Sequence, residues 1–153
     1  MNIHEDIVGL IARTIHDNYY ATQLRAGETG PAVVPWDRLA QDKKESNLAQ
    51  ADDIGHKLSM IKATVAPLVG EVEAFGFTDA ELELLARAEH KRWVAERASQ
   101  GFTFGPVRDD AKKVHPSMLP YDELSASEQQ KDIDAVQGIP ALLADVGLRI
   151  VRL

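Results

Sequence analysis

The residues best suited to chemistry lie at helical spacing in the second half of the chain. His90, Trp93 and Arg97 stand at positions i, i+3 and i+7, so a helix would present them on one face. A tryptophan ring can stack on a planar ligand, while Arg97 and Arg108 can hold its charged group through forked hydrogen bonds. The same face is equally typical of core packing, with the imidazole bonded to a backbone carbonyl. From these residues alone, both interpretations stay open.

Basic residues gather around these positions although the chain as a whole is acidic. The 153 residues carry a formal net charge of −7, whereas residues 85–118 hold seven Lys and Arg against four Asp and Glu, with Lys112 among the seven. A local cluster of cations can attract a small anion whatever the total charge, and it can also be a solvated surface. The acidic total argues against a nucleic-acid partner or an anionic membrane surface.

Two parts of the sequence repeat one another. The pattern apolar-Ala-Arg-x-x-His-x-x-aromatic occurs twice at a shift of 74, and Pro-aromatic-Asp-x-Leu occurs twice at a shift of 85. Duplicated units commonly pack about a pseudo-twofold axis and place a ligand between equivalent surfaces. The matched segments are 11–19 with 85–93, 35–39 with 120–124, and 54–58 with 139–143.

A longer motif gives the chain a family resemblance. Residues 101–110 read Gly-Phe-Thr-Phe-Gly-Pro-Val-Arg-Asp-Asp, and His115-Pro116 and Pro120-Tyr121 follow. On this motif the chain resembles the ryanodine receptor repeat (RyR) domain, over nearly its whole length and most specifically over residues 85–124. The family occurs as a tandem pair in calcium-release channels and as single or fused copies in bacteria and phages. The resemblance implies the prokaryotic or phage type, with two repeat units in one chain, although segment 25–30 lacks the Gly-aromatic motif.

The resemblance also implies a ligand site. The tandem domain of the receptor accommodates adenine nucleotides between its two units, using tryptophans at this helix position and nearby arginines. Trp93, Arg97 and Arg108 match such positions, and Tyr19 replaces the second tryptophan. The predicted ligand-binding residues, between the two units, are Tyr19, His90, Trp93, Arg97, Arg108 and Lys112.

Catalytic and metal sites are not predicted. The sequence has no GxxxxGK[ST] and no GxGxxG after a strand, so neither a P-loop nor a Rossmann site is indicated. It has no cysteine, and its histidines never pair at a helical metal-ligand spacing. No nucleophile, base and oxyanion set can be assembled, so we expect no enzyme, no cofactor and no metal.

The periodicity predicts a mainly α fold made of two helix-loop-helix units. Helices are expected over 4–23, 42–60 and 78–99, and from Ser125 onward with a break at 138–140. Capping boxes are expected at Asn2, Thr78 and Ser125. The predicted single domain comprises unit one, about 1–66, a connector, 67–77, and unit two, about 78–153, with short strands near 62–65 and 148–151.

Three loop features are also predicted. The segment after Gly101, which is expected to end a helix, is interpreted as a bulged hairpin with Phe102 and Phe104 packed inward. Arg108 is expected to pair with the aspartates that follow it. The Pro-aromatic-Asp segments at 35–37 and 120–122 are expected to lead into the second helix of each unit, with the ring buried and the aspartate bonded to backbone amides.

The favoured function is a non-catalytic regulatory or sensor domain that binds a small nucleotide-like ligand between its two units. The alternative is a protein–protein interaction module in which the same surface docks a partner protein, a fused domain or a second copy of the chain. Hydrolysis of a nucleotide derivative is a third, weaker hypothesis. No apolar run reaches the roughly 20 residues that span a bilayer, and the first six residues lack the positively charged n-region of a signal peptide. A cytoplasmic protein without membrane insertion is therefore expected.

Overall fold

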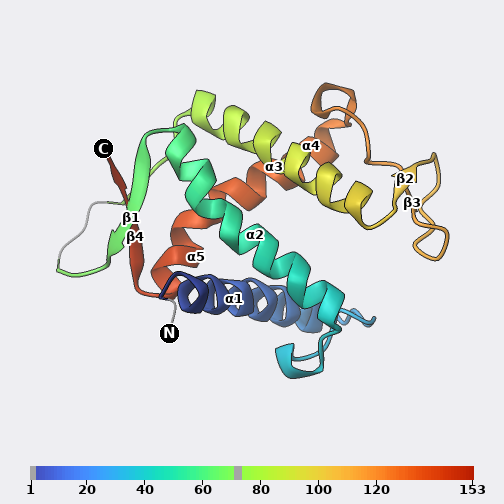
Figure 1. Ribbon diagram of the computed structural model, residues 1–153, viewed down its shortest axis with the longest axis horizontal. Helices are drawn as coiled ribbons and strands as arrows, with labels where there is room; N and C mark the ends of the chain where they lie inside the picture. Colours follow the sequence, from blue (N-terminus) through green and yellow to red (C-terminus); the bar gives the residue numbers. More distant parts are fainter. Residues whose placement is uncertain (1–2, 71–73) are drawn as a thin grey trace. The chain divides into compact units, whose positions relative to one another are not determined.

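The protein is mainly helical, as predicted. The computed structural model describes residues 3–70 and 74–153, and Figure 1 shows its helices and short strands. The helices are α1 (Ile3–Arg25), α2 (Gln41–Met60), α3 (Asp79–Ser99), α4 (Ala126–Gln137) and α5 (Ile139–Asp145). The strands are β1 (Ala63–Pro67), β2 (Thr103–Phe104), β3 (Val114–His115) and β4 (Leu148–Arg152), and two 3₁₀ turns are η1 (Trp36–Arg38) and η2 (Tyr121–Glu123).

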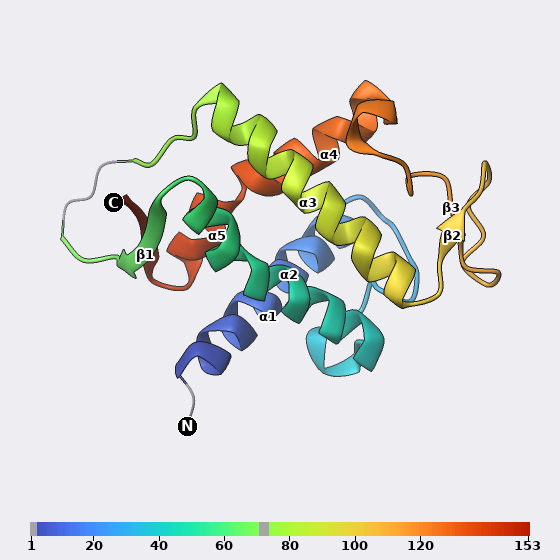
Figure 2. The ribbon, with the colours of Figure 1, turned by 45° about the horizontal axis from the view of Figure 1, so that its top comes forward.

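The chain forms two compact units whose boundaries differ from the predicted ones. Unit 1 comprises residues 1–75 and 139–153, and unit 2 comprises residues 76–138. The C-terminal segment belongs to unit 1 because β4 pairs with β1 in antiparallel register, with Val65 opposite Ile150. Figure 2 shows the dark-red C-terminal strand beside β1. Each predicted strand has backbone donors and acceptors that need a partner. β1 and β4 supply these partners to each other although they are far apart in sequence. A local pattern of residues does not reveal such pairing.

Unit 1 has a core of aliphatic side chains where α1 packs on α2 and α5. Ala12 of α1 and Leu58 of α2 are fully buried, and Leu143 of α5 is nearly so. Ile150 of β4 is also buried in this core. The predicted break at 138–140 is present, because α4 ends at Gln137 and α5 begins at Ile139.

In unit 2, α3 packs against α4 through the buried side chains of Leu85, Ala86 and Val136. The predicted capping box opens α3. The hydroxyl of Thr78 accepts the backbone N–H of Glu81 at 3.1 Å, and the Glu81 carboxylate accepts the backbone N–H of Thr78 at 2.9 Å. Ser125 likewise accepts the backbone N–H of Glu128 at 3.3 Å before α4. The predicted cap at Asn2 lies outside the described residues.

Loss of the α3 cap should destabilise the protein measurably. Thr78→Ala removes an acceptor for an otherwise unpaired helix N–H, and such changes cost about 0.5–2 kcal/mol. Urea melts should show this loss, while Thr78→Ser, which keeps the hydroxyl, should remain within a few tenths of a kcal/mol of the parent. Equal losses in both variants would show that the methyl group, and not the cap, stabilises this position.

The histidines of the repeated motif make the same contact in each unit. His16 Nε2 donates to the carbonyl of Val34 at 2.6 Å, and His90 Nε2 donates to the carbonyl of Leu119 at 2.6 Å. Both histidines are buried. The donors are separated by the shift of 74 and the acceptors by the shift of 85, so the sequence repeat corresponds to a repeated local interaction. The pseudo-twofold relation between the units stays a prediction.

The Pro-aromatic-Asp segments form 3₁₀ turns that lead into α2 and α4, but the prediction for their side chains was wrong. The rings of Trp36 and Tyr121 are half-buried rather than buried. Asp122 pairs with Arg87 at 2.7 Å instead of capping backbone amides, and this hydrogen bond lowers the pKa of the Asp122 carboxyl. The long side chain of Arg87 extends from α3 to the η2 turn. Its charge-assisted hydrogen bond to Asp122 is stronger than a bond between the carboxylate and a neutral backbone amide.

Candidate functional site

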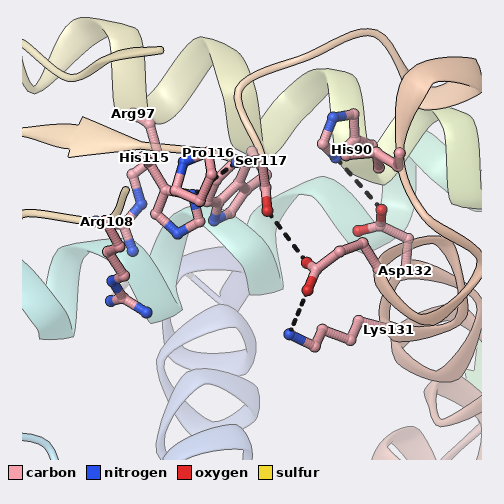
Figure 3. A pocket seen from close by; sticks show the side chains of 11 residues that line it. His90, Arg97, Arg108, His115, Pro116, Ser117, Lys131 and Asp132 are labelled. Carbon is pink, nitrogen blue, oxygen red and sulfur yellow. Dashed lines mark hydrogen bonds and ion pairs between the residues drawn. The ribbon is translucent and has the colours of Figure 1, made fainter. Parts of the chain in front are cut away.

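Unit 2 contains a pocket of about 450 Å³, which is within the size range of small-molecule sites. Three structural parts form its wall: the α3 face, the loop after α3, and the η2–α4 segment (Figure 3). The lining residues are His90, Trp93, Arg97, Arg108, His115, Pro116, Ser117, Leu124, Glu128, Lys131 and Asp132.

Four of the six predicted ligand-binding residues line this pocket: His90, Trp93, Arg97 and Arg108. Lys112 is not among the lining residues. It is exposed, and its backbone N–H donates to the Asp109 carboxylate at 3.1 Å. Tyr19 belongs to unit 1 and is 43% exposed. The hypothesis that Tyr19 shares a ligand with Trp93 stays a prediction.

The end of α3 fixes the position of Arg97. Gly101 has a positive φ of 90°, its N–H donates to Ala98 O at 3.0 Å, and Phe102 N–H donates to Arg97 O at 3.0 Å. These paired bonds are a Schellman motif, and they confirm Gly101 as the predicted helix stop. The motif turns the Phe102 ring back toward the helix, where the Arg97 guanidinium lies 5.1 Å from the ring centroid.

Arg97 has a buried donor without an acceptor. Its Nε is fully buried and has no hydrogen-bond partner, and its Nη1 makes only a long 3.4 Å bond to the Gln100 amide oxygen. No carboxylate among the described residues forms an ion pair with it. A buried unsatisfied donor costs about 1–3 kcal/mol. Because protein atoms cover this nitrogen, a ligand in the pocket would meet the Nη groups of the guanidinium instead.

The ring of Trp93 is surrounded by other side chains. His90 stacks at 5.8 Å between centroids, His115 meets the ring edge-on at 4.8 Å, and the Arg97 guanidinium lies 5.6 Å from its centroid. The indole thus holds Arg97 through a cation–π contact, in addition to lining the pocket. Trp93 would therefore affect ligand binding mainly by orienting the Arg97 guanidinium.

The loop after α3 differs from the predicted hairpin. Two short strands, β2 and β3, pair in parallel, and Phe104 is 53% exposed instead of packed inward. The buried residue of this segment is Gly105, whose backbone packs directly on the Val114 side chain. Backbone bonds between Asp109 and Val114 close the loop at 2.9 and 3.0 Å.

The predicted ion pair of Arg108 is confirmed. Arg108 donates to both carboxylate oxygens of Asp110, at 2.9 and 3.2 Å, and this contact lowers the pKa of Asp110. The pair holds the guanidinium at the pocket wall. It also neutralises part of the charge that a ligand would meet.

His115 presents a neutral imidazole to the pocket. Its Nδ1 accepts the backbone N–H of Ser117 at 3.0 Å, so the ring proton is on Nε2. Burial first, and then the charges of Arg108 and Arg97, lower the pKa of His115. The sequence analysis missed this residue as a site member, although the family motif contains it.

A buried His90–Asp132 pair closes the opposite end of the pocket. His90 Nε2 is already a donor to Leu119, and its Nδ1 lies 3.3 Å from Asp132 Oδ2. In unit 1 the position that corresponds to Asp132, at the shift of 85, is Asn47. An alignment of α2 with α4 would have shown this difference between Asn47 and Asp132, and so would have indicated Asp132 as a residue specific to unit 2.

Asp132 should make stability depend on pH. Burial is the main cause that raises its pKa from 3.8 to about 6. Between these two values the folded protein holds a proton that the unfolded chain has lost. The contribution of Asp132 to the free energy of unfolding therefore falls as pH rises from 3.8 to about 6 and does not change further above that. Urea melts at intervals across this window should show a smaller decrease in Asp132→Asn than in the parent. Parallel curves for the two proteins would contradict the prediction.

Other classes of site find no support in the described residues. Within residues 3–70 and 74–153, no three His, Cys, Asp or Glu side chains are placed to hold a metal ion. No helix in those same ranges combines the length and the apolar character that crossing a membrane requires.

The comparison with known families agrees with the motif. Residues 77–152 match the sequence model of the RyR domain. The match begins just before the capping box of α3 and includes every residue that lines the pocket. Residues 77–152 are therefore similar to the RyR domain, and the similarity covers the whole of the pocket.

Proposed function

We propose that this chain is a non-catalytic regulatory or sensor domain that binds a small nucleotide-like ligand in the pocket of unit 2. One observation carries the proposal: Arg97 lines a cavity of about 450 Å³, and among the described residues its side chain hydrogen-bonds only to the neutral amide of Gln100, with no ion pair to a carboxylate. A structural arginine is normally satisfied inside the protein. A binding arginine keeps a donor for its ligand.

The other lining residues suit an anion attached to an apolar body. Arg108 and the Nε2–H of His115 are further donors at the wall that Arg97 occupies, while Pro116 and Leu124 offer apolar surface. A charge-assisted arginine bond contributes about 1.5–3 kcal/mol, and contact of a base with an aromatic side chain adds about 1–3 kcal/mol. Micromolar affinity is reachable without a metal ion.

We further propose that the two units are repeats of the prokaryotic or phage type, with Tyr19 as the unit 1 counterpart of Trp93. The matched histidine contacts support the repeat. The charged set is specific to unit 2, because Gln23 and Asn47 occupy the positions that correspond to Arg97 and Asp132. The charge contacts of the proposed ligand therefore come from unit 2.

Calorimetric titration tests the proposal. The panel contains the mono-, di- and triphosphates of adenosine, guanosine, cytidine and uridine, together with cyclic dinucleotides. At least one compound should bind the parent, and Arg108→Ala should weaken it about tenfold, because a charge-assisted bond is lost. Lys91→Ala, which removes an exposed cation of α3 outside the pocket, is the matched control. If nothing in the panel binds the folded parent, the interaction-module hypothesis replaces the sensor.

The absence of catalysis has its own test. Nucleotides incubated with the protein and magnesium should be recovered intact, since no nucleophile, base and oxyanion set has been identified. Hydrolysis that His90→Ala abolishes would overturn the non-catalytic assignment and favour the third hypothesis.

A further inference from the structure

Most of the charge in the unit 2 pocket is already neutralised by internal partners. Three cationic side chains line it, namely Arg97, Arg108 and Lys131. Arg108 forms its two-point ion pair with Asp110, and Lys131 pairs with Glu128 at 2.9 Å. Arg97 has only a neutral hydrogen-bond partner, Gln100. The pocket thus offers one positive charge that no described carboxylate pairs.

The pocket also has an acidic end. Glu128 and Asp132 of α4 line it beside Lys131, and in Figure 3 Asp132 and Lys131 lie on the side away from Arg97 and Arg108. The hydrogen bond from Lys131 lowers the pKa of Glu128, so this carboxyl is ionised at neutral pH. Because Lys131 balances Glu128, the negative charge that a second or third phosphate would meet at this end comes from the Asp132 carboxylate.

Resting on the proposed function, we infer that this pocket selects nucleotides that carry a single phosphate and rejects their di- and triphosphates. Arg97 supplies the one unpaired cation, which matches one phosphate group. Each further phosphate adds negative charge without a new unpaired cation and approaches the carboxylates of α4. Two like charges about 6 Å apart repel each other at the effective dielectric constants of a protein surface, so each added phosphate should weaken binding severalfold.

The experiment is a calorimetric titration in metal-free, low-salt buffer, because magnesium would mask the phosphate charge. For each base that binds, the monophosphate should bind most tightly, and the triphosphate should bind about tenfold or more weakly. Glu128→Gln keeps the side-chain shape and leaves Lys131 unpaired. It should reduce the preference for the monophosphate about tenfold, whereas Lys131→Gln should increase it.

The outcomes separate the inference from the proposed function. If a triphosphate or a cyclic dinucleotide binds the parent as tightly as the monophosphate, and Arg108→Ala still weakens that binding, selection by charge is wrong while the ligand site stands. An unchanged preference in both Glu128→Gln and Lys131→Gln would also overturn the inference. If no compound binds the folded parent, the proposed function fails, and the inference fails with it.

Discussion

Replacement of Arg97 by alanine is expected to remove most ligand binding at the unit 2 pocket while leaving the protein folded. The guanidinium has a buried Nε without a partner and no carboxylate to pair with among the described residues. Its loss removes a charge-assisted contact of about 1.5–3 kcal/mol, which weakens affinity about tenfold to hundredfold. The apo protein should change little in stability, because the lost contacts with Trp93 and Phe102 are offset by removal of the unsatisfied donor.

The measurement pairs calorimetric titration with urea melts of the same variants. Arg97→Lys is the informative companion, because lysine keeps the charge but lacks the planar fork that stacks on both rings. It should recover only part of the affinity. A large loss of stability in Arg97→Ala with unchanged affinity would show that Arg97 is a structural residue.

Gly105→Ala is expected to disrupt both the loop after α3 and the pocket that the loop lines. Gly105 is buried, and an added Cβ would overlap the Cγ1 atom of Val114. Overpacking of this kind costs about 1–3 kcal/mol. Val114 precedes His115, which lines the pocket, so the displaced strand would also carry that imidazole out of position.

A compensating variant tests the cause of this effect. Gly105→Ala combined with Val114→Ala removes the overlapping methyl groups and should regain much of the lost affinity and stability. Gly55→Ala, where a Cβ would meet open space in α2, should leave both properties unchanged or raise stability slightly. If the double variant is no better than Gly105→Ala, the glycine serves a purpose other than close approach to Val114.

The helices and their ends were determined by local sequence. The bounds of α2 and α3 lie within a residue or so of the predicted ones, and the capping box at Thr78 and the stop at Gly101 are both present. These features depend on residues a few positions apart, so their spacing in the sequence is their spacing in space. For the same reason the repeated motif correctly pointed to a pair of equivalent histidines.

Part of the candidate site was also accessible from the sequence. His90, Trp93 and Arg97 share a helix face, and helical spacing alone brings them together. Arg108 was added through the family motif, and its pairing within the loop was expected from the neighbouring aspartates. Which of these arginines retains an unpaired charge was not accessible, because that depends on every carboxylate that the fold brings near.

Only the tertiary structure decided the remaining features. The pairing of β1 with β4 joins residues more than eighty positions apart, and it moves the C-terminal segment into unit 1. Glu128, Lys131 and Asp132 enter the pocket because α4 packs on α3, and the two carboxylates among them add negative charge that the basic window 85–118 did not predict. Such contacts are set by burial and packing across the chain, and the order of residues along one helix does not contain them.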